Sequence, residues 1–201
     1  MSEVRVLDVS ALPPGAFGSR ALTFWGTLGI VVIEGTVFAV AIAAYFYLAA
    51  RFPAWPPHGV AAPDLRWGTL NTLLLLGSLV PNELARRAGE NVDLRGVRIW
   101  MVVCLVCALA FNGVRAYEFA HLNVTWDHDA YGSIVWLILG LHTTHIITDF
   151  LDSSVLTALM FTGPVEEHRF VDVEENAVYW YFVVLAWLPI YGVIYWAPRM
   201  L

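Results

Sequence analysis

Four polar side chains lie within a long apolar stretch of the chain, at His142, His145, Asp149 and Asp152. They fall three, four and three residues apart, and on a helix this spacing places all four on one face. Histidine and carboxylate ligands together suit zinc or non-haem iron. The same face could instead contact protons or lipid headgroups, or form a polar seam within a helical bundle. The rest of the sequence has to separate these interpretations.

Three further ionisable residues interrupt apolar stretches: Glu34, Arg115 and Glu118. An ionisable group at the bilayer centre costs roughly 2.5 to 3.5 kcal/mol, so each should face the interior of a bundle and have a partner. Arg115 and Glu118 are three residues apart, and we expect them to form an internal ion pair. Glu34 has two open interpretations: a proton or lipid contact, or a carboxyl group hydrogen-bonded across a helix interface.

The segments that carry these residues predict a membrane protein. The chain is 59% hydrophobic and 14% charged, whereas soluble domains are about 25% charged. A spanning helix needs ~20 mostly apolar residues. Five segments qualify, at 20–50, 67–87, 97–121, 132–161 and 176–197. We therefore predict an all-α integral membrane bundle of five transmembrane helices, with a surface tail at 1–19, a single domain at 20–201, and loops that include 86–98 and 162–176.

The arginines predict the orientation of this bundle, because positively charged short loops stay in the cytoplasm. With the N-terminus inside, seven arginines lie on the inner side and three on the outer side, and Arg115 lies within a span. The N-terminus is therefore expected to be cytoplasmic and the C-terminus on the outer side. The seven inner arginines are Arg5, Arg20, Arg86, Arg87, Arg95, Arg98 and Arg169.

Composition also excludes several classes of function. The net charge of -6 argues against a nucleic-acid partner. All eleven basic residues are arginine, so Schiff-base chemistry on a lysine is excluded. Cys104 and Cys107 lie in an apolar run without a following histidine, which excludes covalent c-type haem attachment. We interpret both cysteines as packing residues.

Five stretches of the chain, in order, resemble subunit III of the haem-copper terminal oxidases. They are EGTVFAVAIAAYFYLAARFPAWPP, NTLLLLGSLVPNELARRA, FNGVRAYEFAH, YGSIVWLILGLHTTHIITD and ENAVYWYFVVLAWLPIYGVIYW. The histidine pair of this family corresponds to His142 and His145, and its membrane glutamate corresponds to Glu34. The chain departs from the family at Tyr181 and Val184, where histidine and aspartate are usual. The likeness extends over roughly residues 20–197 and fits the five-helix form.

This resemblance implies a non-catalytic subunit of a proton-pumping oxidase in a bacterial plasma membrane. Such a subunit packs beside catalytic subunit I, with subunit II nearby, and holds phospholipid. It supports proton uptake and durability during turnover, while haem and copper reside in the partner subunits. No catalytic residue and no metal ligand is then expected in this chain. Its lipid- or proton-associated polar residues are expected to be Glu34, Arg115, Glu118, His142, His145 and Asp149.

Other functions remain open from the sequence. The complex could reduce oxygen or, with this chain as an accessory subunit, nitric oxide, and its electron donor could be cytochrome c or quinol. A stand-alone metal-dependent membrane enzyme would use His142, His145 and Asp149, with Glu118 as a further ligand. A small transporter would use Glu34 and Glu118 as protonatable groups, although the sequence lacks the internal repeats of such folds.

Overall fold

The computed structural model describes residues 17–18, 21–57, 60–162, 165–166 and 168–201. Five long helices account for most of these residues: α1 (Leu22–Ala49), α2 (Leu65–Glu90), α3 (Leu94–Ala120), α4 (Ala130–Phe161) and α5 (His168–Tyr191). A π-helical turn, η3 (Gly192–Trp196), and a short helix, α6 (Ala197–Met200), continue α5. The prediction of an all-α fold is confirmed. The tail and domain limits, 1–19 and 20–201, remain a prediction, and residues 1–16 and 19–20 lie outside the described part.

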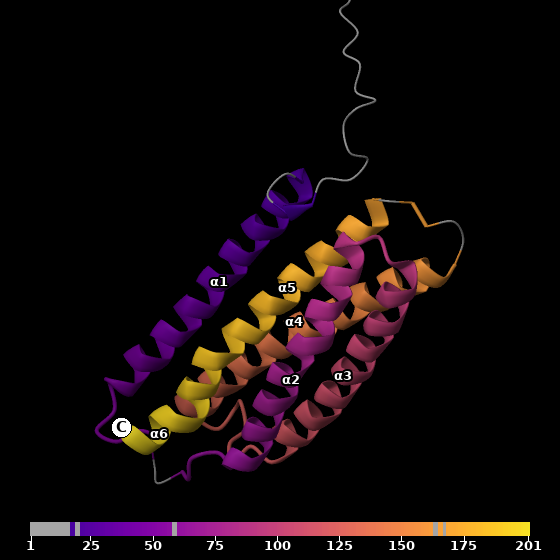
Figure 1. Ribbon diagram of the computed structural model, residues 1–201. Helices are drawn as coiled ribbons and strands as arrows, with labels where there is room; N and C mark the ends of the chain where they lie inside the picture. Colours follow the sequence, from indigo (N-terminus) through magenta and orange to yellow (C-terminus); the bar gives the residue numbers. More distant parts are fainter. Residues whose placement is uncertain (1–16, 19–20, 58–59, 163–164, 167) are drawn as a thin grey trace, which may run out of the picture.

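Helices α2 to α5 form an antiparallel four-helix bundle, and α1 packs on its outside (Figure 1). Helix α2 contacts α3 and α5, helix α4 contacts the same two, and α1 contacts only α4 and α5 among the major helix pairs. The main core contains Leu75, Phe111, Ile138, Val183 and Trp187. A second core cluster lies near the opposite end of the bundle, where Ala85, Val97 and Met160 meet the first turns of α5.

Aspartate side chains define where three of the helices begin. Asp64, Asp93 and Asp129 precede α2, α3 and α4, and each accepts a hydrogen bond from a backbone N–H of the first turn. The O···N distances are 3.0, 3.1 and 2.7 Å. These carboxylates satisfy donors that have no partner within the helix and interact favourably with its dipole.

Four of the helices are long and apolar enough to cross a membrane, within the part of the chain that is described. They are α1, α3, α4 and the continuous segment His168–Met200. Helix α2 has the length for a crossing, with 26 residues, but a lower hydropathy because it carries several polar and charged side chains. The described residues therefore contain four candidate membrane spans, and the five crossings and the orientation of the termini remain predictions.

Two predicted loops are shorter in the structure than the sequence indicated. The predicted loop 86–98 is wrong, because α2 continues to Glu90 and α3 begins at Leu94. Val92 in the resulting tight turn has a φ of 55°. The predicted loop 162–176 is also too long, since α5 begins at His168, inside that range. Phe170 and Val173 of this first part of α5 are buried, whereas Arg169, Asp172 and Glu175 are partly exposed, as in an amphipathic helix.

Candidate functional site

The largest buried polar group, which we call the central cluster, consists of Asn71, Arg115, Glu118, His142 and Tyr195. Arg115 and Glu118 are only 1% and 2% exposed. Arg115 Nη1 lies 2.8 Å from Glu118 Oε2. The predicted internal ion pair is confirmed. Removing one of these two charges would leave the other buried without its countercharge.

Glu118 joins three elements of the bundle through its two carboxylate oxygens. Asn71 Nδ2 on α2 donates a hydrogen bond to Glu118 Oε2. Tyr195 Oη on η3 donates one to Glu118 Oε1. Tyr195 is 1% exposed and lies in the π-helical turn that follows Pro189. A carboxylate that accepts several hydrogen bonds and pairs with an arginine has its charge compensated inside the protein.

Arg115 links the ion pair to the other two helices of the bundle. Its Nη2 lies 3.3 Å from Nδ1 of His142, whose Nε2 lies 3.0 Å from the carbonyl oxygen of Val183. The guanidinium group can only donate and the carbonyl can only accept, so His142 is a neutral imidazole with its proton on Nε2. The guanidinium carbon lies 4.2 Å from the centre of the Trp187 ring, a cation–π contact. Trp187 Nε1 in turn donates to Thr72 Oγ1 at 2.8 Å.

Glu34 attaches α1 to the bundle. Tyr179 Oη on α5 donates a hydrogen bond to Glu34 Oε2 at 2.8 Å. His145 Nε2 on α4 lies 3.5 Å from the same oxygen. His145 Nδ1 lies 2.7 Å from the carbonyl oxygen of Leu141 and donates to it. Of the two interpretations of Glu34, the structure displays the hydrogen bond across a helix interface, while a quarter of the side chain stays exposed.

His142, His145, Asp149 and Asp152 do not form one site, although they lie along one helix. His142 points into the central cluster and His145 toward α1, while Asp149 is buried elsewhere and Asp152 is exposed. The ring nitrogens of both histidines already face other polar groups. Over the described ranges, no three His, Cys, Asp or Glu side chains come together in a way that could hold a metal ion.

An open space of about 530 Å³, which we call the acidic wedge, lies between α1, α4 and α5. Its charged lining residues are Glu34, Asp149, Asp152, Arg169, Asp172 and Glu175. The wedge exists because α1 packs along only part of its length. Phe38 and Tyr45 in its second half are 4% and 0% exposed, whereas Leu22 and Ile33 in its first half are 88% and 65% exposed.

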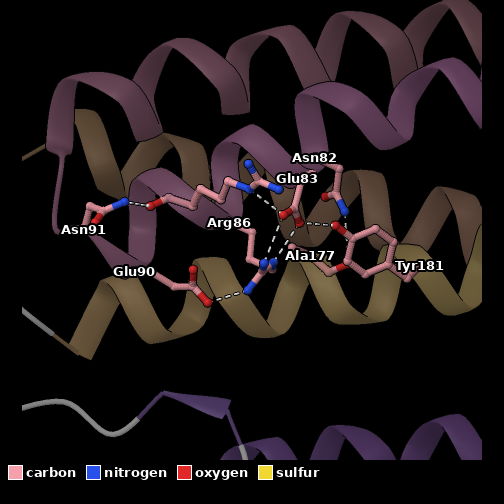
Figure 2. A network of polar contacts seen from close by, with 8 residues as sticks. Asn82, Glu83, Arg86, Glu90, Asn91, Ala177 and Tyr181 are labelled. Atoms are coloured by element: carbon pink, nitrogen blue, oxygen red, sulfur yellow. Dashed lines mark hydrogen bonds and ion pairs between the residues drawn. The ribbon is translucent and has the colours of Figure 1, made fainter.

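A separate ionic network joins α2 to α5 around Glu83 (Figure 2). Arg86 donates to both oxygens of Glu83, at 2.8 and 3.0 Å, and Arg87 donates at 2.6 Å. Tyr181 Oη on α5 donates to Glu83 Oε2 at 2.6 Å. Tyr181 therefore has a defined hydrogen-bond partner on α2. Asn82 Nδ2, beside it, donates to the carbonyl oxygen of Ala177 at 3.1 Å.

Sequence reasoning missed the aromatic and amide partners of the charged residues. Tyr179, Tyr195 and Trp187 each give a hydrogen bond to a polar side chain of another helix. A signal for Asn71, the amide partner of Glu118, was present, since Asn71, Ser78 and Asn82 lie seven and four residues apart and form a polar face on one helix. All three are buried. The aromatic residues carried no such signal, because Tyr and Trp are common throughout this apolar chain.

Together, the fold and these contacts define a class of protein: a multi-pass α-helical membrane protein in which buried charged and amide groups join neighbouring helices. Its polar groups bind one another across the helix interfaces. Such contacts are typical of intramembrane polar residues, which pair with one another or face a cavity.

Comparison with known proteins identifies the family within this class. The family model described as "Cytochrome c oxidase subunit III" matches residues 17–198. The chain belongs to the cytochrome c oxidase subunit III family.

Individual relatives carry the same description. Cytochrome c oxidase subunit 3 of Synechocystis sp. is 25% identical over 182 residues, which cover 90% of this chain and 78% of that protein. The protein of this name from Thermostichus vulcanus is 26% identical over 175 residues, 87% of each chain. That of Triticum aestivum is 31% identical over 144 residues, 71% of this chain and 54% of the relative. The resemblance drawn from the five sequence stretches is confirmed.

Proposed function

We propose that this chain is the non-catalytic subunit III of a proton-pumping haem-copper terminal oxidase that reduces oxygen in aerobic respiration. One observation carries the proposal: in this chain, which belongs to the subunit III family, the buried polar groups bind one another across helices. Glu118 binds Arg115, Asn71 and Tyr195, and Glu34 binds Tyr179. Side chains used in this way stabilise the packing of a subunit. Haem and copper belong to the partner subunits, which we expect to be subunits I and II.

The proposed topology has five crossings of a bacterial plasma membrane, with the N-terminus in the cytoplasm. The distribution of arginines supports the orientation, as seven lie on the proposed inner side and three on the outer side. The antiparallel position of α2 within the bundle supports the fifth crossing (Figure 1). Its residues Asn71, Ser78 and Asn82 are buried, which shields them from lipid.

The acidic wedge is the proposed site for a phospholipid. Ile30, in the first half of α1, is exposed and lines the wedge with an apolar side chain, which suits acyl chains. Arg169, in the first turn of α5, suits a headgroup phosphate, and Asp172 and Glu175 suit a headgroup amine. Glu34 and His145 then lie at the deep end of the lipid site. In this proposal Arg115, Glu118 and His142 fix the helix packing, and Asp149 belongs to proton uptake.

Affinity purification of the tagged chain from its native membrane in mild detergent tests the assignment. We expect haem absorption bands in the visible spectrum of the purified material, and a haem-containing subunit larger than this chain on a gel. A pure chain that carries iron or zinc in stoichiometric amount, without haem bands and without partner subunits, would contradict the assignment. The same preparation, analysed by native mass spectrometry, tests whether a phospholipid stays bound.

A further inference from the structure

Asp149 lies between two separate spaces in the cytoplasmic half of the proposed topology. On one side it lines the acidic wedge. On the other it lines a small inner cavity between α2, α3, α4 and α5, with a volume of about 20 Å³. Asn176 lines both spaces as well. Asp149 and Asn176 therefore form the boundary between an open acidic space and the interior of the bundle.

The Asp149 carboxyl group is buried and incompletely bonded. The residue is 6% exposed, and its Oδ1 has no hydrogen-bond partner among the described residues. It lies twelve residues before the end of α4, or about 18 Å along the helix axis. A buried carboxylate is costly unless it is paired or hydrogen-bonded, and otherwise it becomes neutral by taking up a proton.

No ion pair compensates Asp149 in the part of the chain that the structure describes. Its titratable and charged neighbours across the two spaces are Glu34 on α1, Cys104 on α3, Asp152 on α4, and Arg169, Asp172, Glu175 and Tyr179 on α5. Apart from Arg169, none of them carries positive charge. An acidic lining raises the local concentration of cations, including protons, next to the carboxyl group.

The inner cavity can supply the missing hydrogen bond. Its volume of about 20 Å³ exceeds the ~10–15 Å³ that one water molecule needs. Its walls contain the hydroxyl groups of Ser78 and Ser153 and the amide groups of Asn82 and Asn176. A water molecule there would have the two to four polar partners that buried waters typically use. A neutral Asp149 could donate its proton to that water or accept a hydrogen bond from it.

We infer that Asp149 is a proton-binding site: its carboxylate takes a proton from hydronium in the acidic wedge and, as the neutral acid, hydrogen-bonds to one water in the inner cavity. The step converts carboxylate and hydronium into carboxylic acid and water, so charge and atoms balance. The inference rests on and deepens the proposed function, which assigns Asp149 to proton uptake, by naming the group that binds the proton and the water that it contacts. It is tested on the chain alone, so its failure would leave the assignment as subunit III intact.

Infrared spectroscopy of the full chain in dodecyl maltoside micelles tests the inference, because this detergent has no ester carbonyl group whose band would overlap with that of a carboxylic acid. A protonated carboxylic acid has a C=O stretching band well separated from that of a carboxylate. We expect such a band at neutral pH, and we expect Asp149→Asn to remove one carboxyl's share of it. Asp152→Asn is the matched control, because Asp152 lines the same wedge but is exposed, and this variant should leave the Asp149 share intact. An unchanged band in Asp149→Asn would overturn the inference.

Two further measurements make the test independent of how well one variant folds. In the unmodified chain, transfer to D₂O should shift the band within minutes, because the wedge meets water at its cytoplasmic end, beside Arg169 and Asp172. Alkaline pH should abolish the band. A band that resists both changes would contradict access from the wedge. Ala108→Val adds volume at the cavity wall and should displace the water, moving the band to higher frequency. An unmoved band would refute the water contact.

Discussion

The ion pair between Arg115 and Glu118 gives the sharpest test of how the bundle is stabilised. Arg115→Met keeps a long apolar side chain and removes the charge. Glu118 would then keep its hydrogen bonds from Asn71 and Tyr195 but lose the guanidinium group 2.8 Å away. Both side chains are almost fully buried, so solvent cannot replace the missing charge.

The expected cost follows from this burial. Breaking a buried ion pair by removing one partner typically costs about 3–5 kcal/mol. The cation–π contact with Trp187, at 4.2 Å, is lost as well and contributes roughly 0.5–2 kcal/mol. We expect Arg115→Met to lower the free energy of unfolding by about 4 kcal/mol, close to a thousandfold in the equilibrium constant.

The double variant Arg115→Met, Glu118→Gln separates a charge effect from a packing effect. Glutamine still offers an oxygen to Asn71 or Tyr195, and no unpaired charge remains. We expect this variant to lose only about 2 kcal/mol, less than either single variant, because a buried pair can often be replaced by neutral groups at small cost. Unfolding by SDS in mixed micelles, followed by far-UV circular dichroism, measures the stability of Arg115→Met, of Glu118→Gln and of the double variant.

Arg66→Met is the matched control, since its ion pair with Asp64 spans 4.0 Å and its side chain is 88% exposed. This substitution should not change the unfolding curve measurably. If the two single substitutions at Arg115 and Glu118 each cost less than about 1 kcal/mol, or if their costs simply add in the double variant, the buried pair does not stabilise the bundle as argued here.

Three further predictions concern single positions. Glu34→Gln should leave the complex assembled, since an amide still accepts the hydrogen bond from Tyr179. The variant should nevertheless shorten the half-life of oxidase activity during turnover. Failed assembly on native gels would instead assign Glu34 a purely structural role. Gly68→Ala should lower the free energy of unfolding in micelles by about 1–3 kcal/mol, because the added Cβ would lie 2.4 Å from the Tyr195 ring. Gly77→Ala is the control: its Cβ would meet nothing within 4 Å, so this variant should be neutral or stabilising. Val92→Gly should raise the free energy of unfolding by about 1 kcal/mol, since a β-branched residue at a φ of 55° is strained. An unchanged or lower midpoint of the SDS unfolding curve would count against that strain.

The helices could be predicted from the sequence because lipid-facing segments need long apolar runs, and α1, α3 and α4 have them without ambiguity. The start of α5 was missed for a physical reason. Its first turns carry Arg169, Asp172 and Glu175, and a segment so rich in charged residues is predicted as a loop when only its composition is considered. Burial of Phe170 and Val173 on the other side makes the segment helical.

Only those contacts of the site that join residues of the same helix were predictable from the sequence. Arg115 and Glu118 are neighbours on one helix, so their spacing already determined the pair. His142 and His145 are also three residues apart, but positions at this spacing point about 60° away from each other around a helix. That angle is enough for one ring to reach Arg115 and the other Glu34. Which neighbour each ring meets depends on the packing of other helices, and spacing along one helix carries no information about it.

The attachment of α1 has a consequence for biosynthesis. Tyr179 follows Glu34 by 145 residues, so α1 is synthesised long before the helix that completes its polar contact. Until α4 and α5 emerge from the ribosome, the nascent α1 lacks both groups that the structure places beside its carboxyl group, His145 and Tyr179. The other four helices can associate without it, since α2 to α5 contact one another in a closed ring. Docking of α1 is therefore expected to be a late event in assembly. A chain truncated before α5 would lack Tyr179, so the Glu34 carboxyl group would lose this hydrogen bond and could mark the chain for membrane quality control.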